Sequence, residues 1–306
     1  MSVANLFEHT VNSNQMDGNK AAMNSQKIVV KLGGAILDTQ QNLQAVIEQL
    51  AALYKQGHEI TVVHGAGPQI NNYLKTQGVV PEFCNGWRIT DAQTLMAVFA
   101  ALGEVNAAIV QGLEAVGIPA ASMHAAPDLF TCNKKTGITT KGASVDLGWV
   151  GEIISTDVSS LSKHSGAIAV VSPMGWDQYQ NKYNINADAA AFALAAAMGA
   201  DRLVFMSDVP GVLKDKNDST SIVATLDAER IETLIATGAV SAGMVPKLMN
   251  SLASAQAGVK SVSIISGTAD SALTELVHGE PIGTTVVAGD WRAEFRPRSL
   301  TSAGAA

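Results

Sequence analysis

Apolar and polar residues follow two periods along this chain. Residues 27–32 (KIVVKL) form an apolar run that ends at two glycines, Gly33 and Gly34, which is typical of a buried strand followed by a turn. The next segment has apolar residues at helical spacing before a glycine stop, namely Leu43, Val46, Ile47, Leu50 and Leu53. The pattern therefore predicts a strand, a glycine turn and a helix.

The same unit recurs along the chain. Further strands are predicted at residues 60–65, 167–173, 202–209 and 261–266. Helices are predicted at residues 69–77, from 94 to 117 with Thr90 as the cap, after Asp188, at 226–238 and after Met244. This alternation predicts an α/β protein, a three-layer αβα sandwich with a mainly parallel central sheet. Ligands are then expected at the carboxyl ends of the strands, where the glycines lie.

Two kinds of segment depart from this alternation. Residues 128–152 are rich in threonine and glycine and predict an inserted β-hairpin or lid. Residues 1–26 and 290–306 have the composition of poorly ordered tails.

Composition and charge narrow the class of protein. The chain has 306 residues, 47% of them hydrophobic and 15% charged, so it can bury a large core. Its net charge of −7 and pI near 5.3 argue against nucleic acid as the main partner. Two distant cysteines give no disulfide framework, and the first residues do not form a signal peptide. The alanine-rich stretch after Asp188 is too short to span a membrane. We therefore expect a cytoplasmic protein that acts on small solutes.

Two glycine turns are the first candidates for chemistry. In KLGG, Lys31 precedes Gly33 and Gly34, whose backbone N–H groups can converge on an anion. In HGAG, Gly65 lets a backbone approach a ligand closely. A tight turn or close packing explains such glycines equally well. Neither turn matches the Walker loop or the dinucleotide fingerprint.

Three further segments carry polar side chains that a fold alone does not require. Arg88 in NGWRITDA offers a planar fork of donors for a carboxylate, with a surface ion pair as the alternative. Asn184, Asn186 and Asp188 precede an apolar helix, and capping explains at most one or two of them. Lys247 stands near a helix start, where the helix dipole disfavours it unless an anion lies close.

These segments, in this order, resemble the amino acid kinase family over residues 27 to about 288. The motifs are KLGG, VVHGAGPQI, NGWRITDA, SVDLGWVGE, NINADAAA, MSDVPGVL, SAGMVPK and PIGTTV. The resemblance implies an αβα fold with an N-lobe at about 27–180, which binds an acyl amino acid and forms a homodimer, and a C-lobe at about 181–289, which binds ATP. It implies transfer of a phosphoryl group from ATP, with Mg²⁺, to a side-chain carboxylate.

The resemblance also implies roles for single residues. Lys31 and Lys247 flank the transferring phosphoryl group, and Asp188 holds both lysines, while no metal ligand comes directly from the protein. Arg88 and Asn184 hold the substrate's α-carboxylate and its neighbouring atoms. Backbone groups that receive the phosphate or the reacting carboxylate are expected at Gly33, Gly34, Gly65 and Ala66. The nucleotide segment comprises Ser207, Asp208, Gly211 and Leu213.

The substrate is the least determined element. The RITD segment and the NINAD spacing favour N-acetyl-L-glutamate. The alternatives are another acyl amino acid, such as N-succinylglutamate or an aminoadipate derivative, then glutamate, aspartate or carbamate as the acceptor, and a non-catalytic role as an amino-acid-binding regulator. Ala66 stands where the family usually has glycine. Unlike glycine, an alanine fits this turn only if its φ is negative. Trp87 and Trp149 are larger than the family's usual residues, so they either reshape the acyl pocket or simply pack. The resemblance implies that arginine inhibition goes with an N-terminal helix that joins dimers into a hexamer. The polar N-terminal extension has neither a strong helix propensity nor a wide apolar face, so we expect a homodimer that arginine does not inhibit.

Overall fold

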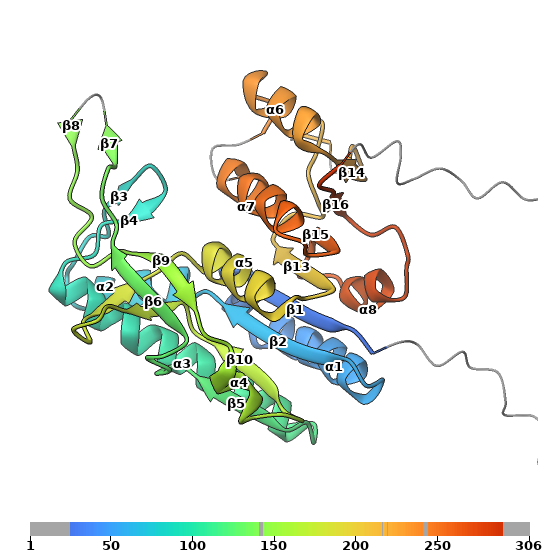
Figure 1. Cartoon of the computed structure of the whole chain (residues 1–306), viewed down its shortest axis with the longest axis horizontal. Helices are drawn as coiled ribbons and strands as arrows, with labels where there is room; N and C mark the ends of the chain where they lie inside the picture. Colours follow the sequence, from blue (N-terminus) through green and yellow to red (C-terminus); the bar gives the residue numbers. More distant parts are fainter. Residues whose placement is uncertain (1–24, 141–142, 216, 219, 241–243, 290–306) are drawn as a thin grey trace, which may run out of the picture.

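The computed structural model describes residues 25–140, 143–215, 217, 218, 220–240 and 244–289. Its centre is an eight-stranded sheet (Figure 1). The strands lie in the order β14 (Thr225–Leu226), β16 (Thr284–Val286), β15 (Ser261–Ser266), β13 (Arg202–Ser207), β1 (Lys27–Leu32), β2 (Glu59–His64), β10 (Ile168–Val171) and β5 (Ala120–Met123). All neighbours are parallel except β15 and β16. The predicted mainly parallel sheet is confirmed.

Helices cover both faces of this sheet. One face packs against α1 (Gln40–Lys55), α2 (Gly67–Thr76), α3 (Ala92–Ala115), α8 (Ala272–Val277) and the 3₁₀ helix η1 (Gly34–Asp38). The other face packs against α5 (Ala187–Met198), α6 (Ala228–Ala236), α7 (Met244–Gln256) and the region of α4 (Ser159–Ser162). Alternate residues of each strand supply the two cores, because side chains of a strand point to opposite faces. The three-layer αβα prediction is therefore confirmed.

β1 and β13 join two groups of strands at the middle of the sheet. Strands β1, β2, β10 and β5 come from the first part of the chain, and β13, β14, β15 and β16 from the last part. The helix after β1 covers one face, and the helices after β13, α6 and α7, cover the other. The connections from β1 and from β13 thus leave on opposite faces of the sheet. In an open α/β sheet, such a reversal leaves a crevice at the carboxyl ends of the two neighbouring strands, here β1 and β13.

A second, four-stranded sheet lies over the α5 face. Its order is β12 (Lys182–Asn184), β11 (Met174–Trp176), β6 (Phe130–Lys134) and β9 (Gly151–Thr156). β6 and β9 are antiparallel, and the short pair β7 (Thr139–Thr140) and β8 (Ala143–Ser144) lies between them in sequence. Figure 1 shows this hairpin projecting beyond the sandwich. The hairpin predicted within residues 128–152 is present, and the sequence did not reveal that its strand β6 pairs with β11.

Two details of α3 differ from the predictions. Asp91, not Thr90, caps this helix: Asp91 Oδ1 accepts from the Thr94 N–H at 2.7 Å, whereas the buried Thr90 hydroxyl donates to the Arg88 carbonyl. Among the helices that the structure describes, α3 is also the one whose length and apolar composition would allow it to cross a membrane, and the sequence did not reveal this. Its apolar residues Ala97, Val98, Leu102 and Ile109 are buried in the core of the sandwich. The two predicted tails lie outside the described residues, apart from Ser25 and Gln26.

Candidate active site

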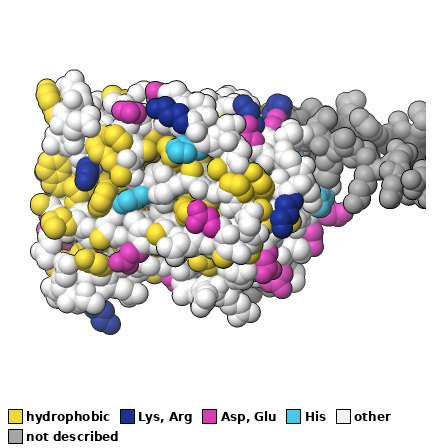
Figure 2. Space-filling model, turned by 90° about the horizontal axis from the view of Figure 1, so that it is seen from below, with side chains coloured by type: hydrophobic (Ala, Val, Ile, Leu, Met, Phe, Trp, Pro, Cys, Tyr) yellow, Lys and Arg dark blue, Asp and Glu magenta, His cyan; other side chains and the backbone are white. Residues whose placement is uncertain are grey.

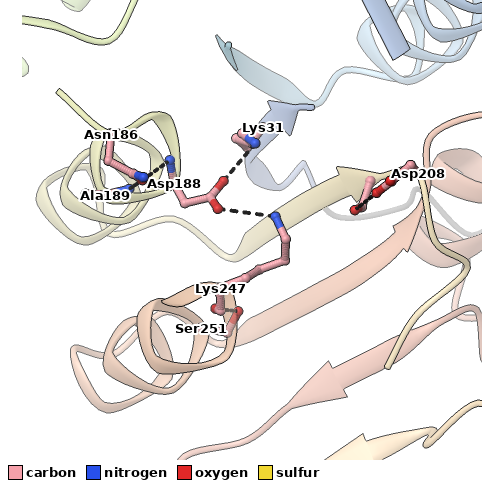
Figure 3. A network of polar contacts seen from close by, with 8 residues as sticks. Lys31, Asn186, Asp188, Ala189, Asp208, Lys247 and Ser251 are labelled. Carbon is pink, nitrogen blue, oxygen red and sulfur yellow. Dashed lines mark hydrogen bonds and ion pairs between the residues drawn. The ribbon is translucent and has the colours of Figure 1, made fainter. Parts of the chain in front are cut away.

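A cluster of three charged side chains lies at the carboxyl end of the central strands. Lys31 is the fifth residue of β1 and shares a face with Val29, so its side chain points toward α5. Asp188 is the second residue of α5. The helix begins there because Asn186 caps it, accepting from the N–H groups of Asp188 and Ala189 at 2.8 and 3.0 Å. The cap fixes the carboxylate over the end of β1 (Figure 3).

Asp188 contacts two lysines at once. Its Oδ1 forms an ion pair with Lys31 Nζ at 2.8 Å, and its Oδ2 accepts from Lys247 Nζ at 3.2 Å. Lys247 comes from the first turn of α7, and its ammonium lies 5.4 Å from the centre of the Phe205 ring. The three side chains are only 10%, 17% and 11% exposed for Lys31, Asp188 and Lys247. The predicted association of these three residues is present in the structure.

The cluster is electrostatically incomplete without an anion. Burial acts to raise the pKa of Asp188, but the charges of Lys31 and Lys247 outweigh it and hold the pKa at about 2. Burial lowers the pKa of Lys247, while Asp188 opposes this and Lys31 adds to it. Within these three residues one carboxylate thus serves two ammonium groups and leaves a net charge of about +1 in a mostly buried place, with Asp208 as the further carboxylate that acts on Lys247. A phosphate group would balance this charge.

The two glycine turns approach this cluster from β1 and β2. The N–H of Gly33 donates to the Met206 carbonyl and that of Gly65 to the Leu32 carbonyl, both at 3.1 Å. These two amides extend the sheet and, in this arrangement, do not face a ligand as we expected from the sequence. The amides of the next residues, Gly34 and Ala66, lie at the start of η1 and at the cap of α2. Helix-start amides have no acceptor inside the helix and suit an anion.

Ala66 fits its turn without strain. Its φ is −152°, which meets the condition set by the sequence. The residue is buried in the apolar cluster shared with α1 and α3. Since Lys31 lies on the opposite face of the sheet, the Ala66 methyl group contributes to the core and does not crowd the lysine.

Arg88 is a buried cation with one side unused. Its Nη2 donates to Asn71 Oδ1 at 2.7 Å, and its guanidinium lies 4.7 Å from the centre of the Phe83 ring. Its Nη1 is buried and has no hydrogen-bond partner among the described residues. Burial lowers the pKa of Arg88. A buried guanidinium without a counter-charge is costly, so a carboxylate is the natural ligand here.

Asn184 belongs to the same neighbourhood. Its Nδ2 donates to Thr90 Oγ1 at 3.2 Å, and Thr90 Oγ1 donates to the Arg88 carbonyl at 2.9 Å. The backbone N–H of Asn184 donates to the carbonyl of Trp149, whose own N–H donates to the Thr90 carbonyl. Arg88 and Asn184, far apart in sequence, are thereby joined through Thr90.

The two tryptophans pack in different ways. Trp87 packs against the small cluster of Cys84, Leu147 and Val150, and Lys135 Nζ lies 4.8 Å from the centre of its ring. Trp149 contacts the Tyr183 ring, with centroids 5.7 Å apart. Each therefore has a packing role beside the Arg88 region.

The expected nucleotide residues divide into two groups. Ser207 ends β13 and donates to Asp208 Oδ1 at 2.9 Å, and the negative charge of Asp208 acts to raise the pKa of Lys247. Gly211 is buried where a Cβ would stand 2.9 Å from Thr284 Oγ1, so packing explains this glycine. Leu213 is half-buried and pairs with Ile222. Asp208, which accepts from Ser207, thus lies on the side of Lys247 (Figure 3).

Two residues near the site were not singled out from the sequence. Asn71, on α2, orients Arg88, but an asparagine in a polar helix gives no signal of this role. His64 is fully buried at the end of β2 and contacts the Gly65 carbonyl. Its signal was available, because a titratable side chain directly after an apolar strand and before a glycine turn is unusual in a core.

The fold and the charged cluster define a class of protein. A sequence model of the amino acid kinase family matches residues 26–266, and the chain belongs to this family. Within it, the chain is similar to curated relatives named acetylglutamate kinase. The relative from Koribacter versatilis is 41% identical over 267 residues, covering 86% of this chain and 99% of the relative. The one from Symbiobacterium thermophilum is 36% identical over 272 residues, covering 85% and 91%.

Solved structures agree on the fold. The N-acetylglutamate synthase from Neisseria gonorrhoeae in complex with coenzyme A and N-acetyl-glutamate matches with a TM-score of 0.76 at 22% identity, over 87% of this chain and 60% of that one. A carbamate kinase from Giardia lamblia bound to AMP-PNP matches with a TM-score of 0.65 at 16% identity, over 87% of this chain and all of that one. At such identities the likeness concerns architecture.

Proposed function

We propose that this enzyme transfers the γ-phosphoryl group of ATP to the side-chain carboxylate of N-acetyl-L-glutamate, giving ADP and N-acetyl-L-glutamyl 5-phosphate, a step of arginine biosynthesis. The observation that carries the proposal is the buried Lys31–Asp188–Lys247 cluster, in which two ammonium groups share one carboxylate. The relatives named acetylglutamate kinase support the choice of substrate.

The chemistry needs charge and alignment more than covalent help. The acceptor is a carboxylate, which is already ionised at neutral pH, so no general base is required. A carboxylate oxygen bonds to the γ-phosphorus as the bond to the leaving oxygen of ADP breaks. Lys31 and Lys247 stabilise the negative charge on the transferring group and on the leaving side, and Asp188 keeps both ammonium groups in place. The amides of Gly34 and Ala66 add two neutral donors.

Substrate recognition falls to a separate group of residues. Arg88, with its unused Nη1, binds the α-carboxylate, and Asn184 binds neighbouring polar atoms. Ser207 and Asp208 lie on the nucleotide side. We place the acyl amino acid in an N-lobe of residues 27–180 and ATP in a C-lobe of residues 181–289.

Mg²⁺ belongs to this proposal as a partner of the nucleotide. When bound, it neutralises charge on the β- and γ-phosphates. Among the described residues no three His, Cys, Asp or Glu side chains cluster closely enough to hold a metal ion. We expect the ion to be held chiefly by phosphate oxygens and water, as Mg²⁺ often is.

We also propose a cytoplasmic homodimer. Val80, Phe83 and Met96 are large apolar side chains that are 81%, 54% and 75% exposed, from α3 and the segment that precedes it. Figure 2 shows hydrophobic side chains gathered toward the left end of that face. A second copy of the chain would cover such a surface. The free, buried cysteines Cys84 and Cys132 fit a reducing compartment. The N-terminal extension discussed above lies outside the described residues, so the expected insensitivity to arginine remains a prediction.

The function is tested by measuring ADP release with a panel of acceptors. The panel contains N-acetyl-L-glutamate, N-succinyl-L-glutamate, N-acetyl-L-aminoadipate and free L-glutamate. Hydroxylamine added to the same reaction converts an acyl phosphate to a hydroxamate and so identifies the product. We expect the highest kcat/KM with N-acetyl-L-glutamate. A higher value with another acceptor would reassign the substrate, and no hydroxamate with any of them would refute the proposal.

A further inference from the structure

A buried polar network lies beneath the HGAG turn, on the face of the sheet that α3 covers. It contains His64 from β2, Asn106 from α3, Ser122 from β5, Ser172 after β10, and His124. His64, Asn106 and Ser172 are 0%, 1% and 2% exposed. Buried polar groups are costly unless they are fully hydrogen-bonded, and nothing in the chemistry above uses these residues.

Both ring nitrogens of His64 have partners. Nδ1 lies 3.2 Å from the Gly65 carbonyl oxygen. Nε2 lies 3.1 Å from Ser172 Oγ and 3.1 Å from Asn106 Nδ2. A carbonyl oxygen can only accept a hydrogen bond, so the Nδ1 contact requires a proton on Nδ1.

The orientation of Asn106 then fixes the state of the other nitrogen. Asn106 Nδ2 also donates to the Val170 carbonyl at 2.8 Å, and its Oδ1 accepts from Ser122 Oγ at 2.6 Å. The amide is therefore held with its NH₂ group toward His64 and Ser172, whose Oγ lies 3.3 Å from Nδ2. Because burial keeps the ring neutral at pH 7 and Nδ1 carries its proton, Nε2 accepts. The network is satisfied when His64 is neutral and carries its proton on Nδ1.

The Gly65 carbonyl belongs to the same peptide group as the Ala66 N–H. In a trans peptide the C=O and N–H bonds point in opposite directions. His64 holds the carbonyl on the α3 face of the sheet, so the Ala66 N–H points toward the other face. That is the face on which Lys31 meets Asp188 and Lys247.

We propose that His64 is a positioning residue: its neutral, Nδ1-protonated ring holds the Gly65–Ala66 peptide so that the Ala66 N–H faces the transferring phosphoryl group. The inference rests on the proposed function. It also explains why a titratable side chain occupies the end of an apolar strand. A flip of this peptide would present a carbonyl oxygen to the phosphates in place of an N–H.

The surroundings keep the ring neutral. Burial and, to a smaller extent, the nearby His124 lower the pKa of His64 to about 4, against the opposing effect of the Gly65 carbonyl. His124, whose Nδ1 contacts Ser172 Oγ at 3.0 Å, fits beside α3 because Gly103 leaves room for its ring. Burial and the charge of Lys182 both lower the pKa of His124.

A matched pair of substitutions tests the proposal. In His64→Asn the side-chain NH₂ lies near the position of Nδ1 and can still donate to the Gly65 carbonyl. In His64→Gln the amide reaches the position of Nε2 and leaves that carbonyl without its donor. We expect His64→Gln to lower kcat by about 10²-fold, as loss of an oriented donor does, and His64→Asn to retain kcat within about 5-fold. KM for ATP should change little in both.

Stability separates positioning from folding. Both substitutions disturb the network, so their melting temperatures should fall by similar amounts. Ser122→Ala is the control, because it removes a bond to Asn106 and leaves the three contacts of the His64 ring. Equal loss of kcat in the Asn and Gln variants, in step with their melting temperatures, would assign His64 a structural role and overturn the proposal.

A measurement without substrate keeps the test independent of the proposed function. Nitrogen-15 NMR distinguishes the two neutral tautomers of a histidine ring, and the signals lost in His64→Asn identify those of His64. Protonation on Nδ1 at pH 7 supports the proposal, and protonation on Nε2 or on both nitrogens refutes it. If the wild-type enzyme phosphorylates another acceptor of the panel, the kcat comparison is made with that acceptor. Absence of any kinase activity would refute the proposed function, while the tautomer would still decide whether His64 holds the Gly65–Ala66 peptide.

Discussion

Replacement of Asp188 by asparagine should weaken both the folded state and the reaction. The substitution keeps the size of the side chain and removes the negative charge between Lys31 and Lys247. The two lysines lie 2.8 and 3.2 Å from the carboxylate and are almost completely buried. If the carboxylate is lost, water therefore cannot adequately solvate their ammonium groups in its place.

The magnitude follows from the pKa of Asp188. A shift from the usual value of 3.8 to about 2 corresponds to about 2.5 kcal/mol of net stabilisation of the charged form. Because the folded-state pKa is depressed, this contribution is present above the unfolded pKa and is lost as the pH falls through about 2. The free energy of unfolding of Asp188→Asn should thus lie about 2–4 kcal/mol below that of the wild type at pH 7. The difference should persist at pH 5 and narrow only below about pH 4.

Urea unfolding followed by tryptophan fluorescence measures this difference at both pH values. Lys247→Met provides a double-mutant cycle, since removing one lysine relieves part of the uncompensated charge. We expect the two losses of stability to be non-additive by about 1 kcal/mol or more. For activity, kcat of Asp188→Asn should fall by about 10²-fold or more. Additive losses, or a variant as stable and as active as the wild type, would show that the lysines do not depend on Asp188.

Four further predictions concern single residues. Lys31→Ala and Lys247→Ala should each lower kcat by about 10²-fold, because each removes transition-state charge stabilisation; near wild-type turnover would exclude that lysine from the mechanism. Arg88→Lys loses the planar fork and should raise KM for the acyl amino acid but not for ATP, which steady-state kinetics with each substrate varied will check. Ala66→Gly should keep its activity while losing about 1 kcal/mol in urea unfolding, since only a buried methyl group is removed; loss of activity in a folded variant would give that methyl group a role in the pocket. Because the pKa of His64 is lowered to about 4, the unfolded chain binds a proton at this residue between pH 6.5 and 4 that the folded chain excludes. The free energy of unfolding should therefore fall by about 3 kcal/mol over this range. Its slope against pH should be smaller in His64→Asn.

The fold was predictable where the strands are fully buried. Residues 27–32, 202–207 and 261–266 read as apolar runs and form β1, β13 and β15 with nearly the predicted bounds. β5, with the sequence AASM, has small residues and gives no strand signal. β16 has only three residues, and its antiparallel pairing with β15 and parallel pairing with β14 define it.

One hairpin could have been predicted and was not. Asn85 and Gly86 connect β3 (Phe83–Cys84) to β4 (Trp87–Arg88), and both have positive φ, at 49° and 81°. Asn-Gly is the strongest short-range signal for a two-residue hairpin turn. Reading it would have placed Arg88 on a strand rather than just before a helix.

The site was predictable only in part, because contacts between distant segments leave no local pattern. The resemblance to the family brought Lys31, Asp188 and Lys247 together, and the structure gives them a common geometry. It could not show that the amides of Gly33 and Gly65 are engaged in the sheet, since this depends on the register of β1 with β13 and of β2 with β1. Nor could it show that Gly211 is required by the Thr284 side chain.

The proposed division of labour has a consequence for how such an enzyme changes substrate. The charged cluster rests on β1, α5 and α7, which are tied to the central sheet. Arg88 and Thr90 lie beside the β3–β4 turn, and Asn184 lies on the second sheet. Bonds through Thr90 and Trp149 join these recognition residues to one another, and Asp188 stands only four residues beyond Asn184. Asn186 lies between the recognition residue Asn184 and the cluster residue Asp188, and it caps α5. The start of α5, and with it Asp188, is therefore held by the cap and does not depend on the position of Asn184. Changes around Trp149 can therefore alter which acyl group fits while the lysines keep their geometry.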